Sequence, residues 1–251
     1  MNKIIAANWK MNNLKRDIDD FLDKFNKNRE SINYKNREIL IAPVSIYFDY
    51  FKNKVEKYKL NIQVGLQNCH YEDKGAFTGE ISPLMVADIN ADFVIIGHSE
   101  RRNLFKEDDE FINKKLIATL QKNIKTIFCI GEKLEQRENN ETFDILKSQI
   151  ENGLKNIPNS LISNLIVAYE PVWAIGTGKT ATVNQIEEVH DFIKDFFKKN
   201  IAINLPILYG GSVKPSNIKD IINVNSVDGV LVGGASLKFE DFQKIINFDK
   251  E

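Results

Sequence analysis

The stretch Phe93–Arg102 reads FVIIGHSERR, an apolar run rich in β-branched residues that is followed at once by polar ones. The run Phe93–Gly97 is typical of a strand, and the Ser-Glu-Arg-Arg segment after it is typical of a helix start. Apolar and polar residues do not alternate in the run, as expected for a parallel strand that is covered on both faces. We predict a buried parallel strand that leads into a helix.

The same unit recurs along the chain. Short apolar runs alternate with longer segments whose apolar residues lie three and four positions apart, such as Ile18, Phe21, Leu22 and Phe25. The predicted strands are Ile4–Ala7, Glu38–Ala42, Ile62–Leu66, Phe93–Gly97, Thr126–Ile130, Leu165–Tyr169, Ile207–Tyr209 and Gly229–Val232. Eight strands alternating with eight helices fit a closed (β/α)₈ barrel or an open doubly wound sheet. No G-x-G-x-x-G motif follows the first strand, which favours the barrel, with eight parallel strands enclosed by helices.

Length and composition bound the organisation. A chain of 251 residues matches one barrel of about 250 residues, and no change in composition marks a linker, so we expect a single barrel domain over residues 1–251. The 34 basic and 35 acidic residues give a net charge of -1, which does not point to nucleic acid or an anionic membrane.

The beginning of the chain and its cysteines indicate a location. The first apolar run, Ile4–Ala7, has only four residues before the polar Asn8, which is too short for a signal peptide, and no run approaches the ~18 apolar residues of a membrane span. Cys69 and Cys129 provide neither a disulfide framework nor zinc-ligand spacing. We expect a cytoplasmic protein without a metal.

Unusual residues follow the predicted strands, where a barrel gathers its functional groups. They are Lys10 after the first strand, His98 after the fourth, Glu170 after the sixth, and the pairs Gly210-Gly211 and Gly233-Gly234 after the seventh and eighth. Taken singly, each has a plain structural explanation: a surface lysine, a hydrogen-bonding histidine, a salt-bridged carboxylate, tight turns. Together they predict a site at one mouth of the barrel.

The chemistry of these residue types suggests roles. Glu170 is a candidate general base, because the segment Pro171–Ala181 after it is typical of a lid that excludes water and raises basicity. N–H groups at a helix start would keep one nitrogen of His98 unprotonated, so that the other can donate to a substrate oxygen. A lysine such as Lys10 inside a barrel mouth needs an anionic partner. Backbone N–H groups of the glycine pairs suit a phosphate dianion. We interpret His70 and His190 as structural or surface residues.

The chain resembles the triosephosphate isomerase family over essentially its whole length. The stretches that carry the resemblance are Ala7–Asn12, Gly75–Ser82, Ile96–Arg102, Cys129–Glu132, Ala168–Ala181, Tyr209–Val213 and Val227–Leu237. The resemblance implies interconversion of dihydroxyacetone phosphate and D-glyceraldehyde 3-phosphate through an enediolate, in glycolysis and gluconeogenesis, with no metal or other cofactor.

The resemblance also implies roles for single residues. Glu170 would be the base, His98 would polarise the carbonyl and shuttle protons, and Lys10 would stabilise the enediolate. Asn8 would help to hold the substrate, and Glu100 would position Lys10 and His98 by hydrogen bonds. The phosphate would be bound by Gly176, Ser212, Gly233 and Gly234.

A homodimer is a further implication, because Gly75–Ser82 resembles the loop that projects into a partner subunit. Thr78 would then reach the neighbouring site and brace Asn8 or Lys10. Asn13 and Val44 depart from the family pattern, where glycine and proline are common, and we expect an effect on loop shape alone. Cys129 is interpreted as a packing residue.

Two alternatives compete with the isomerase. Another barrel enzyme with a phosphorylated substrate, such as a sugar-phosphate epimerase, predicts a phosphate site without the lid or the His-Ser-Glu-Arg-Arg segment, and both are present. A catalytically silent, phosphate-binding barrel that acts as a binding protein predicts the loss of Glu170, His98 or Lys10, and all three are retained.

Overall fold

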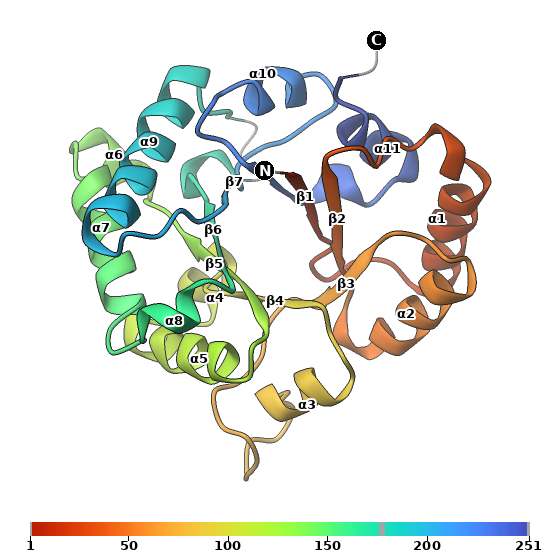
Figure 1. Ribbon diagram of the computed structural model, residues 1–251, viewed down its shortest axis with the longest axis horizontal. Helices are drawn as coiled ribbons and strands as arrows, with labels where there is room; N and C mark the ends of the chain where they lie inside the picture. Colours follow the sequence, from red (N-terminus) through yellow and green to blue (C-terminus); the bar gives the residue numbers. More distant parts are fainter. Residues whose placement is uncertain (1, 176–178, 250–251) are drawn as a thin grey trace.

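The computed structural model describes residues 2–175 and 179–249. Its strands are β1 (Lys3–Asn8), β2 (Arg37–Ala42), β3 (Gln63–Leu66), β4 (Phe93–Ile96), β5 (Lys125–Ile130), β6 (Leu165–Tyr169), β7 (Ile207–Tyr209) and β8 (Gly229–Val232). Each strand pairs in parallel with its neighbour in sequence, and β1 also pairs with β8, so that the sheet is a closed barrel. Figure 1 shows the helices around this barrel. The predicted (β/α)₈ fold is confirmed.

Strand positions agree with the sequence prediction to within one residue at each end. β4 stops at Ile96 and not at Gly97, because Gly97 has a φ of 77°, in the left-handed region that ends a strand. β1 extends to Asn8, which pairs with Ala42 of β2.

The helices are more numerous than predicted. The described residues form α1 (Lys15–Lys27), α2 (Phe48–Lys57), α3 (Pro83–Asp88), α4 (Ser99–Leu104), α5 (Asp109–Gln121), α6 (Leu134–Glu138), α7 (Thr142–Gly153), α8 (Asn159–Ile162), α9 (Val183–Asn200), α10 (Ile218–Ile222) and α11 (Phe239–Ile246), with 3₁₀ helices η1 (Arg29–Ser31), η2 (Ser45–Tyr47), η3 (Val172–Ala174) and η4 (Gly234–Ser236). Left-handed residues cause the extra breaks: Lys106 separates α4 from α5, and Asn140 separates α6 from α7.

Two layers of apolar side chains fill the molecule. One layer lies inside the barrel and comprises Ile4, Ala6, Leu40, Ala42, Phe93, Ile95, Ile127, Cys129, Ile166, Ala168, Leu208 and Leu231. The other fills the space between the strands and the helices. Cys129 is fully buried in the inner layer, and this burial raises the pKa of its thiol, so that it packs as an apolar residue.

Trp9 fixes the chain just before Lys10. Its ring is fully buried, edge-on to Phe21 at 5.0 Å and to Phe51 at 5.1 Å, and its indole N–H donates to the Ser236 carbonyl at 3.0 Å. The end of β1 is therefore hydrogen-bonded to the segment that follows β8, the strand that pairs with β1 to close the barrel.

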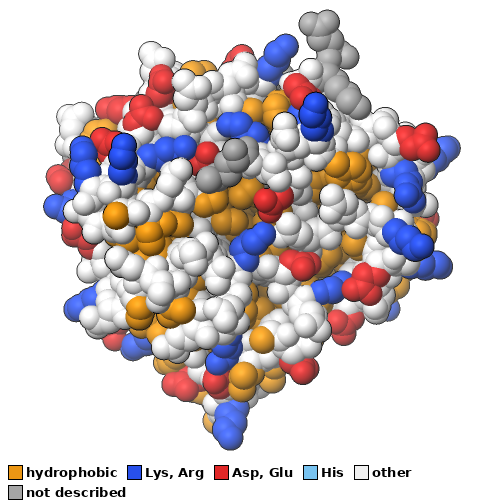
Figure 2. All heavy atoms as spheres, in the orientation of Figure 1, with side chains coloured by type: hydrophobic (Ala, Val, Ile, Leu, Met, Phe, Trp, Pro, Cys, Tyr) orange, Lys and Arg blue, Asp and Glu red, His pale blue; other side chains and the backbone are white. Residues whose placement is uncertain are grey.

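The surface matches the balanced composition. Lysine and arginine side chains are interspersed with aspartate and glutamate over the face shown in Figure 2, and no field of one sign covers it. Among the described residues, none of the helices is long and apolar enough to cross a membrane.

The seam between β1 and β8 depends on Gly229. A Cβ at this position would lie 2.0 Å from the Ile4 carbonyl oxygen, and only backbone movement relieves that clash. We expect Gly229→Ala to lower the free energy of unfolding by about 3 kcal/mol, measured by urea denaturation. The control is Gly234→Ala, whose Cβ meets nothing within 4 Å and should change stability by less than about 0.5 kcal/mol. Equal stability of the two variants would contradict the prediction.

Candidate active site

The carboxyl ends of the strands enclose a cavity of about 310 Å³. It is lined by Asn8, Lys10, His98, Glu170, Ile175, Gly210, Gly211, Ser212, Val213, Lys214, Leu231, Gly233, Gly234 and Ala235. Nine residues predicted from the sequence for catalysis or binding are therefore brought together here: Asn8, Lys10, His98, Glu170, Gly210, Gly211, Ser212, Gly233 and Gly234. Gly176 lies outside the described residues, and Thr78 lines neither this cavity nor the one beside it.

The predicted base is held in a closed arrangement. Glu170 follows β6 and its side chain is 2% exposed. Its Oε2 accepts the Ser99 backbone N–H at 2.8 Å, and its Oε1 lies 3.1 Å from Nε2 of His98. Both carboxylate oxygens thus have a partner on the segment that follows β4, and the carboxylate is shielded from water.

His98 is the N-cap of α4, and its tautomer follows from that position. Nδ1 accepts the backbone N–H of Glu100 at 3.2 Å, so the ring proton of the neutral imidazole is on Nε2, the atom that faces Glu170. The predicted contact between a helix start and one imidazole nitrogen is present. Nε2–H is therefore a donor on the cavity wall, directed at Glu170 Oε1.

Lys10 is held by its backbone as well as by its ammonium group. Its φ of 51° is left-handed; its N–H donates to Asn8 Oδ1 at 3.0 Å, and its carbonyl accepts from Gln67 Nε2 at 2.9 Å. Nζ lies 2.5 Å from Glu100 Oε1. Asn8 and Glu100 thus both fix the lysine.

The expectation for Glu100 holds in part. Its carboxylate contacts Lys10, but its Oε2 is 3.8 Å from Nδ1 of His98, beyond hydrogen-bond distance. The Glu100 backbone makes that contact in its place, because the first turn of a helix directs its N–H groups toward the N-cap residue.

Gly233 and Gly234 leave part of the cavity wall open. A Cβ on Gly233 would lie 3.5 Å from Cε of Lys10, and a Cβ on Gly234 would have no neighbour within 4 Å. A ligand can therefore approach the backbone of Gly233 and Gly234 closely. Ser212, which follows Gly210-Gly211, lines the same cavity.

The segment after Glu170 is anchored at both ends. At the first end, Trp173 Nε1 donates to Glu132 Oε1 at 2.9 Å, and Tyr169 OH donates to the same oxygen at 3.0 Å. At the second end, the Tyr209 hydroxyl is hydrogen-bonded to the Ala181 backbone, while burial raises its pKa to about 12. The middle of the predicted lid, 176–178, lies outside the described residues.

Two of these contributors were missed in the sequence. Glu132 is fully buried, and that burial raises the pKa of its carboxyl group. Gln67 directly follows β3, so the strand-end rule that found Lys10 and Glu170 would also have found it. Glu132 lies two residues beyond β5 and carries the same signal.

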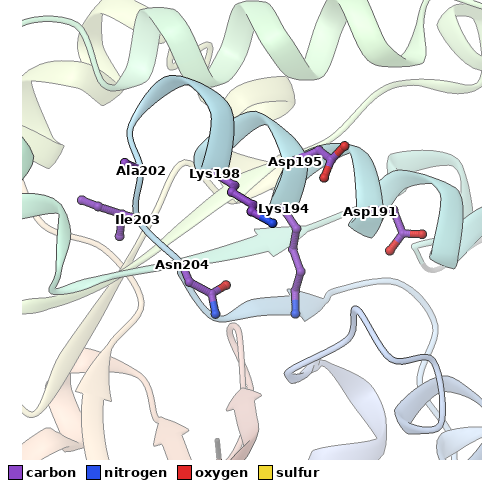
Figure 3. Close-up of a pocket in the computed structure, with 7 residues that line it drawn as sticks. All are labelled: Asp191, Lys194, Asp195, Lys198, Ala202, Ile203 and Asn204. Carbon is purple, nitrogen blue, oxygen red and sulfur yellow. The ribbon is translucent and has the colours of Figure 1, made fainter.

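A second, larger cavity of about 740 Å³ lies at the end of α9 and carries no comparable chemistry. Figure 3 shows Asp191, Lys194, Asp195 and Lys198 projecting from the helix, and Asn204 from the loop after it. Lys194 pairs with Asp228 at 3.1 Å and Asp195 with Lys199 at 3.0 Å, so these charges are compensated at the surface.

The two remaining histidines are structural, as interpreted from the sequence. His70 Nδ1 accepts the Glu72 N–H at 3.0 Å, and its ring stacks on Tyr71 with 4.3 Å between centroids. His190 is fully buried on α9 beside Tyr169 and Tyr209. In the part of the chain that the structure describes, no three His, Cys, Asp or Glu side chains are grouped to hold a metal ion.

The buried His190 should make stability depend on pH. Burial lowers its pKa to about 3, whereas an unfolded histidine has a pKa of about 6.5. Between these values the unfolded chain binds a proton that the folded protein does not, so acid lowers stability through this residue by about 1.4 kcal/mol per pH unit. We expect His190→Asn to flatten the fall in unfolding free energy below about pH 6.5, measured by urea denaturation at several pH values. Parallel curves for the two proteins would contradict this.

A closed parallel barrel with a buried carboxylate and a neutral imidazole at its mouth defines a (β/α)₈-barrel enzyme of the acid–base type. The sequence model of one family, described as Triosephosphate isomerase, matches residues 3–249. The chain belongs to the triosephosphate isomerase family and is an isomerase.

Relatives of high similarity carry the same description. Triosephosphate isomerase from Thermodesulfovibrio yellowstonii is 49% identical over 251 residues, which cover 98% of this chain and 99% of the relative. Those from Finegoldia magna and Clostridium tetani are 46% and 44% identical, over 98% of this chain and 98% and 96% of the relatives.

Proposed function

We propose that this chain interconverts dihydroxyacetone phosphate and D-glyceraldehyde 3-phosphate by proton transfer through an enediolate. The observation that carries the proposal is the contact of 3.1 Å between His98 Nε2 and Glu170 Oε1 on the wall of a cavity that Gly233 and Gly234 also line. The reaction moves a proton between two carbons, for which it needs a base, and between two oxygens, for which it needs a neutral donor. The site holds both groups in contact.

Glu170 removes a proton from the carbon beside the carbonyl group. His98 Nε2–H donates to that carbonyl oxygen, and for this the substrate oxygen must replace Glu170 Oε1 as its partner. The carboxylate thereby turns from the imidazole toward the carbon. Its side chain is 2% exposed, so water is largely excluded from the carboxylate while it takes the proton.

Lys10 stabilises the negative charge that develops on the enediolate oxygens. In the resting site the positive charge of Nζ is balanced by Glu100 Oε1 at 2.5 Å. An arriving anionic substrate gives the same ammonium group a second negative partner. Asn8, at the Lys10 backbone N–H, holds this geometry and lines the substrate cavity. His98 then carries protons between the two oxygens, and Glu170 returns its proton to the neighbouring carbon.

The phosphate is bound by Ser212, Gly233 and Gly234, and by Gly176 of the lid. The glycine wall of the cavity supports this assignment, because backbone N–H groups there can approach a dianion closely. The reaction moves protons and transfers no electrons to another molecule, so its balance calls for no redox cofactor. Closure of the lid excludes water and protects the enediolate from losing phosphate.

The chain forms a cytoplasmic homodimer, with each 251-residue protomer a single barrel domain. Large exposed apolar side chains support the dimer: Met11, Ile46, Leu84, Met85, Leu104 and Phe105. A cavity of about 340 Å³, lined in part by Met11 and Phe105, adjoins the substrate cavity and shares Asn8, Lys10 and His98 with it. The loop between β3 and α3, at the bottom of Figure 1, projects from the barrel and carries the exposed Thr78. This loop of one copy enters the cavity of the other, where Thr78 braces Asn8 or Lys10.

Enlarging Thr78 should separate the protomers. We expect Thr78→Arg to weaken dimerisation by about a hundredfold, because the longer charged side chain does not fit the cavity, with sedimentation velocity as the measurement. Ser160→Arg, on the exposed face of α8, adds the same charge elsewhere and should leave the dimer intact. A Thr78→Arg dimer as stable as that of the control would remove the proposed role of the loop.

The activity itself is tested with the purified protein and glyceraldehyde 3-phosphate, without added metal or cofactor, by following the appearance of dihydroxyacetone phosphate. We expect fast conversion. A folded dimer that converts no substrate would refute the proposal and favour the silent, phosphate-binding barrel.

A further inference from the structure

We propose that Gln149, on the outer helix α7, is a positioning residue for the base Glu170 and for the first anchor of the lid. This inference rests on the proposed isomerase function. Gln149 does not line the substrate cavity and is half-buried on the outside of the barrel, where α7 lies between α5 and α9 (Figure 1). It acts through the backbone of Gly131.

Gln149 holds both backbone groups of one residue. Its Oε1 accepts the Gly131 N–H at 2.8 Å, and its Nε2 donates to the Gly131 carbonyl at 3.1 Å. Gly131 directly follows β5, beyond the last ladder pair of β5 and β6, which joins Ile130 to Tyr169. The Gln149 side chain thus provides hydrogen bonds to Gly131 at the point where the ladder between β5 and β6 has ended. Two bonds from one planar amide fix the position of the glycine and also its rotation.

Gly131 lies directly against the backbone of Glu170. A Cβ on Gly131 would be 1.7 Å from the Glu170 carbonyl oxygen, so the two backbones are in contact with no room for a side chain. The Glu170 N–H also donates to the Ile130 carbonyl at 2.7 Å. A shift of the Ile130-Gly131 segment is therefore passed to the residue that carries the base.

The next residue anchors the lid. Glu132 accepts Trp173 Nε1 through its carboxylate at 2.9 Å, and its backbone carbonyl accepts the Val172 N–H at 3.1 Å. Residues Gly131 and Glu132 thus support Glu170 on one side and the start of the lid on the other. Because active-site geometry tolerates little displacement, the clamp on Gly131 affects the chemical step without contact to the substrate.

A helix-packing contact of the same size provides the matched control. Asn113 of α5 donates through Nδ2 to the Gly153 carbonyl at 2.8 Å and to the Lys155 carbonyl at 2.9 Å, at the C-terminal end of α7 and just beyond it, about one turn after Gln149. Asn113→Ala and Gln149→Ala each remove two hydrogen bonds that hold α7 and its surroundings. Only Gln149→Ala releases the segment beside the base.

We expect Gln149→Ala to lower kcat about tenfold with KM changed by less than about twofold, because the geometry of the transition state is lost and substrate binding is kept. Asn113→Ala should lower Tm by a similar amount and leave kcat at the wild-type level. Unchanged kcat in Gln149→Ala, or equal losses of kcat in the two variants, would overturn the inference. Lack of activity in the wild-type protein would instead refute the isomerase function, and this inference with it.

Gln149→Glu tests the clamp in a protein of the same shape. The ionised carboxylate keeps an acceptor for the Gly131 N–H but has no donor for the Gly131 carbonyl, whereas the protonated acid supplies an O–H donor. We expect the ratio of variant to wild-type kcat to be low at about pH 8 and to rise toward about pH 5, as the carboxyl group takes up its proton. A ratio that stays constant with pH would overturn the inference. This test does not depend on whether Gln149→Ala folds.

Discussion

Glu170→Gln should lower kcat by about 10²–10⁴-fold and the unfolding free energy by at most about 3 kcal/mol, because the new amide N–H₂ faces the His98 Nε2–H. The amide has the shape of the carboxylate and still offers an oxygen to the Ser99 N–H, but it does not accept a proton from carbon. Steady-state kinetics and urea denaturation measure the two quantities.

The control for this variant is Glu38→Gln. Glu38 is a carboxylate of β2, paired with Lys125 at 3.3 Å, and it does not line the substrate cavity. It should retain wild-type kcat. Parallel losses of activity and stability in Glu170→Gln would show that the carboxylate is needed for the fold and would count against its role as the base.

Lys10→Met should lower kcat/KM by about 10²–10³-fold, the effect of removing one group that stabilises an oxyanion. The loss has a second part, because Glu100 loses its partner at 2.5 Å and leaves an uncompensated negative charge beside an anionic substrate. The double variant Lys10→Met/Glu100→Gln removes that charge and should recover part of the loss.

Lys147→Met is the matched control for the lysine, since it removes an exposed ammonium group from α7, 4.0 Å from Glu151. It should leave kcat/KM unchanged. A double variant no more active than Lys10→Met alone would mean that Glu100 does not oppose the substrate, and would limit its role to holding the lysine.

The strands could be located from the sequence because most are short apolar runs rich in β-branched residues that end at a polar or glycine residue. The same rule found Lys10, His98 and Glu170, since barrel closure brings all strand ends to one mouth. The predicted number of helices was too low, because single left-handed residues such as Lys106 and Asn140 interrupt otherwise helical patterns.

Contacts between loops could not be predicted in the same way. Whether the Glu100 carboxylate reaches Lys10 or His98 depends on a rotamer, and it reaches only the lysine. The support of Gly131 by Gln149 joins residues 18 positions apart through a helix whose rotation about its own axis is set by packing against α5 and α9. Sequence spacing carries no information on that rotation.

The seam between β1 and β8 has a consequence for the newly made chain. Ile4 is paired with Gly229, so the ring of strands closes only after the chain as far as Gly229 has left the ribosome. At about 5–20 residues per second, β1 waits for roughly 10–45 s with one edge unpaired. During synthesis the nascent chain therefore presents an open, apolar sheet, the kind of intermediate that chaperones protect from aggregation.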